Sequence, residues 1–156
     1  IEQDLGIKLN SVVVMGIGEP FDNYDEIVQF VRIINDDKGI KIGARHITVS
    51  TCGLVPKIYE FSKLPLQINL AISFHAPTDE IRNTLMPVNK VYNIEALVQA
   101  IKDYLNVTGR RVTIEYVMLD SVNDSIECAK TLAKIFKGMI IYVNLIHYNE
   151  TNEIGF

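Results

Sequence analysis

The sequence is poor in cysteine and has no long hydrophobic run. Its two cysteines, Cys52 and Cys128, are far apart and form no C-x-x-C pair. They are too few for a disulfide framework or a zinc site, which predicts a reducing, cytoplasmic location. The longest apolar run has only a few residues, against the roughly 20 that span a bilayer. This excludes a transmembrane helix and a membrane partner.

An excess of positive charge is also absent. Lysine and arginine number 15, aspartate and glutamate number 19, and the formal net charge at pH 7 is −4. This argues against a domain that binds nucleic acid through bulk charge, although a local basic face remains possible. Two candidate patches are present: one comprises Lys41, Arg45, His46 and Lys57, and the other comprises Arg110 and Arg111.

The 156 residues, of which 48% are apolar and 22% charged, have the composition of one ordinary globular domain. The sequence shows no low-complexity segment and no secretory leader, and it begins with Ile1 rather than Met. These features predict an excerpt of a longer protein, and nothing in the sequence divides 1–156 into two domains.

Short β-branched runs alternate with amphipathic segments along the chain. Strands are predicted at 11–15, 46–50, 67–74, 112–119 and 140–146, and helices at 24–34, 55–61, 94–105 and 125–136. The run of valines at 11–15 predicts a strand buried on both faces. The alternation predicts an α/β fold of βα repeats with a parallel sheet, because parallel neighbours need a crossover connection. The pattern does not decide between an open sheet and a barrel, but in both, ligands bind at the carboxyl ends of the strands.

The first predicted strand runs into a glycine-rich loop, Met-Gly-Ile-Gly-Glu-Pro (15–20). The two glycines allow a tight turn, and Glu19 places a carboxylate beside it. This loop suits an ammonium group better than a phosphate, because Glu19 would repel an anion. The G-x-G-x-x-G pattern is absent, since Phe21 stands where its third glycine would be. A plain turn with a solvated glutamate explains the loop equally well.

Small polar side chains end the second predicted strand. Ser50, Thr51 and Cys52 could donate hydrogen bonds to a carboxylate or a ribose, but such residues are as often turn formers. Cys52 has no basic partner placed by the sequence, which favours a buried, inert thiol over a nucleophile.

The later strands also end in candidate ligand-binding residues. His75 follows the third strand directly and precedes a proline, and 144–149 could recognise a purine edge through its amides and aromatic ring. The segment 120–125, after the fourth strand, is better explained by turn and capping chemistry. Because these groups all follow successive strands, the sequence predicts that they lie together in one ligand-binding site.

Taken together, these motifs resemble one family. Met-Gly-Ile-Gly-Glu-Pro (15–20), Ile-Thr-Val-Ser-Thr-Cys-Gly (47–53), Ala-Ile-Ser-Phe-His-Ala-Pro (71–77) and Leu-Met-Pro-Val-Asn-Lys (85–90) are similar to motifs of the radical S-adenosylmethionine adenine methyltransferases, the RlmN/Cfr family. The match continues through 115–119, 122–125 and 143–146. It covers almost the whole chain in order. Members most like this chain methylate C2 of adenine in 23S rRNA and tRNA.

The resemblance implies a site, a cofactor and an architecture. The S-adenosylmethionine site falls on Gly18, Glu19, Ser50, Ser73, Phe74, His75 and Asn149. Within it, Glu19 is expected to hold the amino group of the cofactor. The implied fold is an incomplete TIM-like radical SAM barrel that lacks its first strand, and the resemblance implies that 1–156 is the central part of a single catalytic domain.

The family's cluster and methyl-carrier cysteines are not matched in this chain. The family binds a [4Fe-4S] cluster through a C-x-x-x-C-x-x-C motif, which is absent, so its ligands are expected before Ile1. Cys52 and Cys128 cannot replace them, since a cluster needs three or four closely spaced thiolates. No catalytic or metal-binding residue is therefore predicted within this chain.

Three alternatives remain open from sequence. The enzyme could methylate C8 of adenine in rRNA, as the family members that confer antibiotic resistance do. The chain could belong to a cluster-free (β/α) barrel enzyme, although no lysine stands at a strand end and no late glycine-rich phosphate loop is present. It could also be a non-catalytic binding module.

Overall fold

The predicted strands form one parallel sheet whose spatial order follows the chain, β1-β2-β3-β4-β5. The computed structural model describes residues 6–149. The strands are β1 (Val12–Val14), β2 (Ile47–Thr51), β3 (Asn69–Ser73), β4 (Val112–Met118) and β5 (Ile141–His147). Every neighbouring pair is parallel. The prediction of an α/β fold with a parallel sheet is therefore confirmed.

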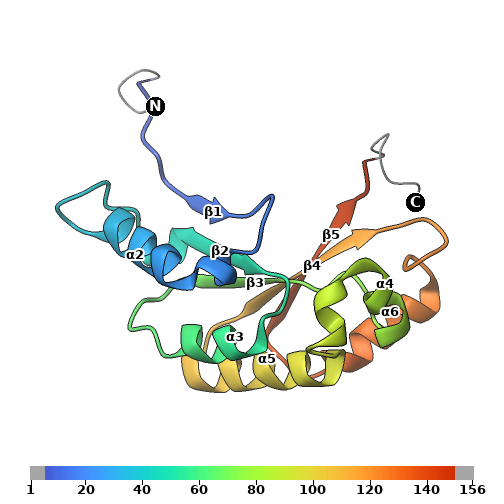
Figure 1. Ribbon diagram of the computed structural model, residues 1–156. Helices are drawn as coiled ribbons and strands as arrows, with labels where there is room; N and C mark the ends of the chain where they lie inside the picture. Colours follow the sequence, from blue (N-terminus) through green and yellow to red (C-terminus); the bar gives the residue numbers. More distant parts are fainter. Residues whose placement is uncertain (1–5, 150–156) are drawn as a thin grey trace.

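Helices connect successive strands and lie mainly on one side of the sheet. They are α2 (Tyr24–Asn35), α3 (Val55–Ser62), α4 (Asp79–Leu85), α5 (Ile94–Thr108) and α6 (Ile126–Ile135), with short 3₁₀ turns at Pro20–Asn23, Ala44–His46 and Pro87–Lys90. Figure 1 shows α3, α5, α4 and α6 beneath the curved sheet, α2 beside β1 and β2, and no helix of the described chain above it. Within residues 6–149, no helix is long and apolar enough to cross a membrane.

Local capping sets the helix ends that the sequence predicted. The Asn93 side chain accepts a hydrogen bond from the Ala96 amide at the start of α5, and Gly109 ends that helix with a φ of 62°. Ser125 caps α6 in the same way, by accepting from the Cys128 amide. Helix α4 was not predicted, because its seven residues are too few to show an amphipathic period.

Strand periodicity separates an apolar face from a polar one. The face toward the helices carries fully buried residues, namely Ile47, Val49, Leu70, Ile72, Val112 and Ile114. Alternate positions point to the opposite, concave face, since side chains in a strand have a period of two. Those positions are mostly polar: Thr48, Ser50, Asn69, Ser73, Thr113 and Glu115. The fold therefore places a polar surface above an apolar core.

The expectation that 11–15 is buried on both faces was wrong. Val12 and Val14 pack against the core, but Val13 is 61% exposed. Among the described residues β1 pairs with β2 alone, and its second face turns to the concave side, where no helix covers it.

Candidate cofactor-binding site

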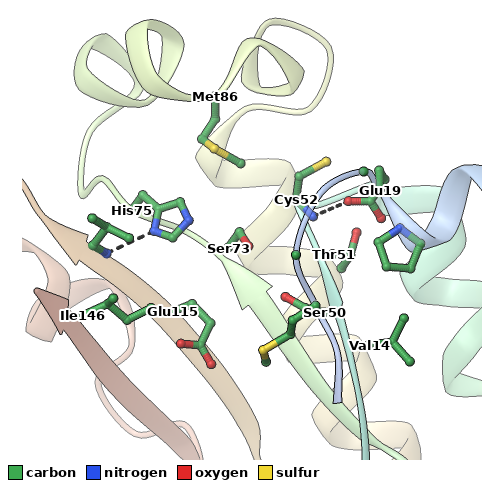
Figure 2. A pocket seen from close by; sticks show the side chains of 15 residues that line it. Val14, Glu19, Ser50, Thr51, Cys52, Ser73, His75, Met86, Glu115 and Ile146 are labelled. Carbon is green, nitrogen blue, oxygen red and sulfur yellow. Dashed lines mark hydrogen bonds between the residues drawn. The ribbon is translucent and has the colours of Figure 1, made fainter. Parts of the chain in front are cut away.

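A cavity of about 480 Å³ opens at the carboxyl edge of the sheet. Segments from all five strands contribute to its wall, as parallel strands bring their carboxyl ends to one edge. Figure 2 shows the lining side chains, which are Val14, Met15, Glu19, Pro20, Ser50, Thr51, Cys52, Ser73, His75, Met86, Glu115, Val117 and Ile146, together with Gly16 and Gly18.

Glu19 joins the loop after β1 to the end of β2. Its Oε1 accepts a hydrogen bond from the Phe21 amide at 3.0 Å, and its Oε2 accepts one from the Cys52 amide at 2.6 Å (Figure 2). Gly18 just before it has a φ of 97°, which favours glycine. Each carboxylate oxygen keeps a second lone pair, so Glu19 can still accept from a ligand ammonium group while it anchors the loop.

Two hydroxyl residues at the end of β2 line the cavity, and one of them also stabilises a turn. Ser50 and Thr51 are both lining residues, and the Thr51 hydroxyl accepts hydrogen bonds from the Gly53 and Leu54 amides. Burial, together with the hydrogen bond and charge of Glu19, raises the pKa of the Cys52 thiol to about 12. The thiol therefore stays protonated at neutral pH, which does not suit a nucleophile or a metal ligand.

His75 is held as a neutral hydrogen-bond donor at the end of β3. Its Nδ1 faces the Val117 amide at 3.1 Å, and because that N–H donates, the ring proton must sit on Nε2. Its backbone has a φ of 58°, and the Asn123 side chain donates to its carbonyl at 2.7 Å. Burial, and to a smaller degree the positive charge of Arg82, lowers the His75 pKa to about 4.

Two residues implied by the resemblance do not line the cavity. Phe74 is fully buried on the helix side, where its ring packs 5.1 Å from the ring of Phe136. Side chains alternate between the two faces along β3, so the residue that follows Ser73 points to the helix side. Asn149 is exposed and is not among the lining residues.

Arg82 is a site residue that sequence reasoning missed. Its fully buried guanidinium donates from Nε to the Phe74 carbonyl at 3.0 Å. Its Nη2 donates to the Cys52 carbonyl at 2.7 Å and to the Ser73 carbonyl at 3.1 Å. Arg82 therefore links the ends of β2 and β3, and the unpredicted helix α4 is what positions it.

Glu115 is a second residue that was missed. It lies on the cavity wall, is 7% exposed, and accepts a hydrogen bond at Oε2 from the Asn144 side chain at 2.6 Å. It escaped notice because it sits within β4 rather than after it. A lone charged residue in the apolar run Val112–Met118 was the signal that could have found it.

Comparison with known proteins identifies the family. The sequence profile of the Radical SAM superfamily matches residues 3–150. The chain belongs to the Radical SAM superfamily.

Within this superfamily, the chain is similar to RlmN proteins. It is 57% identical over 155 residues to a probable dual-specificity RNA methyltransferase RlmN of Acholeplasma laidlawii, covering 99% of this chain and 46% of the relative. It is 53% identical to the protein of the same name from Thermoanaerobacter sp., covering 100% of this chain and 45% of the relative. A radical SAM methyltransferase from Sphaerobacter thermophilus superposes with a TM-score of 0.89 at 47% identity, covering 92% of this chain and 42% of that one. The chain thus spans less than half the length of these relatives.

The family's two cofactors fit this chain differently. The cavity has the donors and acceptors for a nucleoside cofactor: serine hydroxyls, the His75 Nε2–H and two carboxylates. Residues 6–149 hold no group of three or more histidine, cysteine, aspartate or glutamate side chains placed to bind a metal. An iron–sulfur cluster therefore does not fit the described part of the chain, whereas S-adenosylmethionine does.

The two candidate basic patches are rearranged by the fold. Lys41 pairs with Asp37, and Lys57 pairs with Glu60. Arg45 instead joins Arg110 and Arg111 around a separate hollow. This hollow lies before β2 and β4, at the amino edge of the sheet.

Proposed function

We propose that the protein containing this chain is a radical SAM RNA methyltransferase that methylates C2 of adenine in 23S rRNA and tRNA. In this proposal, residues 1–156 supply most of the S-adenosylmethionine pocket. The observation that carries it is the cavity that brings together Gly18, Glu19, Ser50, Ser73 and His75 from separate strand ends. The similarity to proteins named dual-specificity RNA methyltransferase RlmN supports the choice of RNA as substrate.

Each side chain in the cavity has a role that its chemistry suits. Glu19 accepts from the cofactor's ammonium group, which is a charge-assisted hydrogen bond. The Ser50 and Ser73 hydroxyls hydrogen-bond polar atoms of the cofactor. Neutral His75 presents its Nε2–H as a fixed donor, because Nδ1 is occupied by the Val117 amide. The ligands of the [4Fe-4S] cluster belong to another part of the full-length protein.

Product analysis of the full-length, iron-reconstituted protein tests the proposal. We expect methyl transfer from S-adenosylmethionine to a 23S rRNA fragment and to tRNA, with 2-methyladenosine as the modified nucleoside in the digest. Finding 8-methyladenosine would favour the C8 alternative, and an iron-free, inactive protein would favour a cluster-free barrel or a binding module. A Glu127→Gln variant is a matched control, since exposed Glu127 contacts Lys130 and neither residue lines the cavity.

A further inference from the structure

Three arginines gather around a hollow of about 430 Å³ at the amino edge of the sheet. Arg45 precedes β2, whereas Arg110 and Arg111 precede β4, so the fold brings distant parts of the chain together here. The other lining residues are all neutral, and none of the lining residues is shared with the cavity at the opposite edge. The hollow is therefore a separate, positively charged feature of a chain whose net charge is −4.

Acidic groups do not compensate the charges of these arginines. Within residues 6–149, every ion pair joins a lysine to a carboxylate three or four positions away, and none involves an arginine of the hollow. Arg110 is the least exposed of the three, and its Nε is buried without a hydrogen-bond partner among the described residues. Like charges held close together repel one another, and a bound anion would relieve that repulsion.

Two neutral amide side chains near the start of β3 orient two of the arginines. Arg45 Nε donates to Gln67 Oε1 at 2.8 Å, and Arg110 Nη2 donates to Asn69 Oδ1 at 2.7 Å. The Asn69 amide group also donates to the Arg45 carbonyl at 2.7 Å, which connects the two sides of the hollow. A carboxylate at either position would neutralise an arginine, whereas an amide fixes the guanidinium and leaves its charge in place.

Structural roles explain only part of this arrangement. Helix α5 ends at Thr108, and a helix C-terminus attracts positive charge, which accounts for Arg110 two residues later. It does not require the exposed Arg45, which precedes another strand. Arg111 is also exposed, and its guanidinium carbon lies 4.4 Å from the centre of the Tyr142 ring. Two positioned, exposed guanidinium groups therefore remain available to a ligand.

We propose that this hollow is a phosphate-binding site, which holds a backbone phosphate of the RNA substrate. This rests on the proposed function, which makes RNA the substrate. The planar fork of an arginine matches the oxygens of a phosphate, and clustered arginines are typical of nucleic-acid binding surfaces. Because every nucleotide carries the same phosphate, such a contact positions the RNA without reading its sequence.

The place of the hollow decides which part of the RNA it holds. Arg111 directly precedes β4, and Val117, near the other end of that strand, lines the cavity. From 111 to 117 the strand spans about 20 Å. The bound phosphate therefore belongs to a segment about that far from the adenine that reacts at the cavity. A short hairpin that carries only the target adenine and its loop does not reach the hollow.

Filter binding with the full-length, reconstituted protein tests the assignment. The probes are a long 23S rRNA fragment and a short hairpin that contains the target adenine. One phosphate contact adds about 0.7–0.9 to the slope of log affinity against log salt, which corresponds to about 5- to 8-fold in affinity at 0.1 M salt. We expect Arg45→Gln with Arg111→Gln to lose at least that slope and affinity for the long fragment and to bind the hairpin unchanged. Arg32→Gln with Lys130→Gln removes the same charge outside the hollow and is the control.

A nearly isosteric substitution separates the charge of the hollow from its structure. Gln67→Glu keeps the oxygen that accepts from Arg45 Nε and adds one negative charge beside it. If the arginines had a structural role alone, the new ion pair would leave RNA binding unchanged. The phosphate assignment predicts instead that Gln67→Glu binds the long fragment at least about 5-fold more weakly. Its affinity for the hairpin and for S-adenosylhomocysteine should not change. Gln29→Glu, on the exposed side of α2, is the matched control.

Three outcomes would overturn the assignment and leave the proposed function intact. The first is equal binding of the long fragment by wild type, Gln67→Glu and the double arginine variant. The second is an equal loss for the fragment and the hairpin, which would place the contact near the target loop. The third is arginine-dependent binding of inorganic pyrophosphate, measured by calorimetry, that does not compete with the long fragment and so assigns the hollow to a small anion. A wild-type protein that binds neither RNA would overturn the proposed function as well.

Discussion

Replacing Arg82 tests how the cavity is held together. Arg82 is fully buried and donates to backbone carbonyls at the ends of both β2 and β3. It also donates from Nη1 to the buried Asn89 side chain at 2.9 Å. Arg82→Met keeps most of the aliphatic length and removes every donor. Arg82→Lys keeps the positive charge but has a single ammonium group in place of the planar fork.

The expected loss of stability follows from the buried acceptors that lose a hydrogen-bond partner. The Cys52 carbonyl and the Asn89 side-chain oxygen accept hydrogen bonds from Arg82, and a buried acceptor left without a partner costs about 1–3 kcal/mol. Relief of the buried charge offsets part of this cost. We therefore expect Arg82→Met to lower the free energy of unfolding by about 3–5 kcal/mol, in the range for removing one partner of a buried charged network. Arg82→Lys should lose about half as much, because one ammonium group can replace part of the network.

Urea unfolding of the full-length protein measures these losses of stability. Titration calorimetry measures the affinity of the cavity for S-adenosylhomocysteine. Arg32→Met is the matched control, since Arg32 is exposed on α2 and its loss should change stability by less than about 0.5 kcal/mol. Weaker cofactor binding by Arg82→Lys at a temperature where it remains folded would show that the arginine aligns the two strand ends. An Arg82→Met variant with wild-type stability and wild-type affinity would refute the reasoning.

Three further predictions concern the same edge of the sheet and the charge of the chain. The pKa of His75 is about 4 in the fold and 6.5 in an unfolded chain, so below pH 6.5 the unfolded state binds the proton first. Stability should be constant above about pH 7 and fall by up to about 3 kcal/mol between pH 6.5 and 4, and urea unfolding of His75→Asn should show a weaker pH dependence. Glu19→Gln cannot accept from both the Phe21 and Cys52 amides, so it should weaken S-adenosylhomocysteine binding at least about 10-fold; unchanged affinity in calorimetry would remove Glu19 from the site. The isolated chain, with net charge −4, should bind RNA weakly and lose that binding as salt is added in a filter assay; tight, salt-resistant binding would contradict this.

The sequence alone determined the order and type of most elements, because those signals are local. The spacing of apolar residues predicted the helix that the structure places at Ile94–Thr108, and Gly109 marked its end. β-branched runs predicted all five strands, and their alternation with helices required a parallel sheet. The rule that ligands bind at carboxyl ends of parallel strands pointed to Glu19, Ser50 and His75, and the family resemblance added Ser73.

Only the tertiary structure decided which polar groups face the cavity and which are already partnered. Glu19 looked free in sequence, but its oxygens accept from the Phe21 and Cys52 amides, and the second of these lies 33 residues away. Arg82 on α4 donates to backbone carbonyls at the ends of β2 and β3, and such backbone acceptors carry no sequence signal. Glu115 and Asn144 meet because β4 and β5 pair in one register, and a shift of β5 by one residue would turn Asn144 to the other face. Hydrogen bonds between distant segments depend on register and packing, whereas helix periods and strand ends depend on neighbours in the chain.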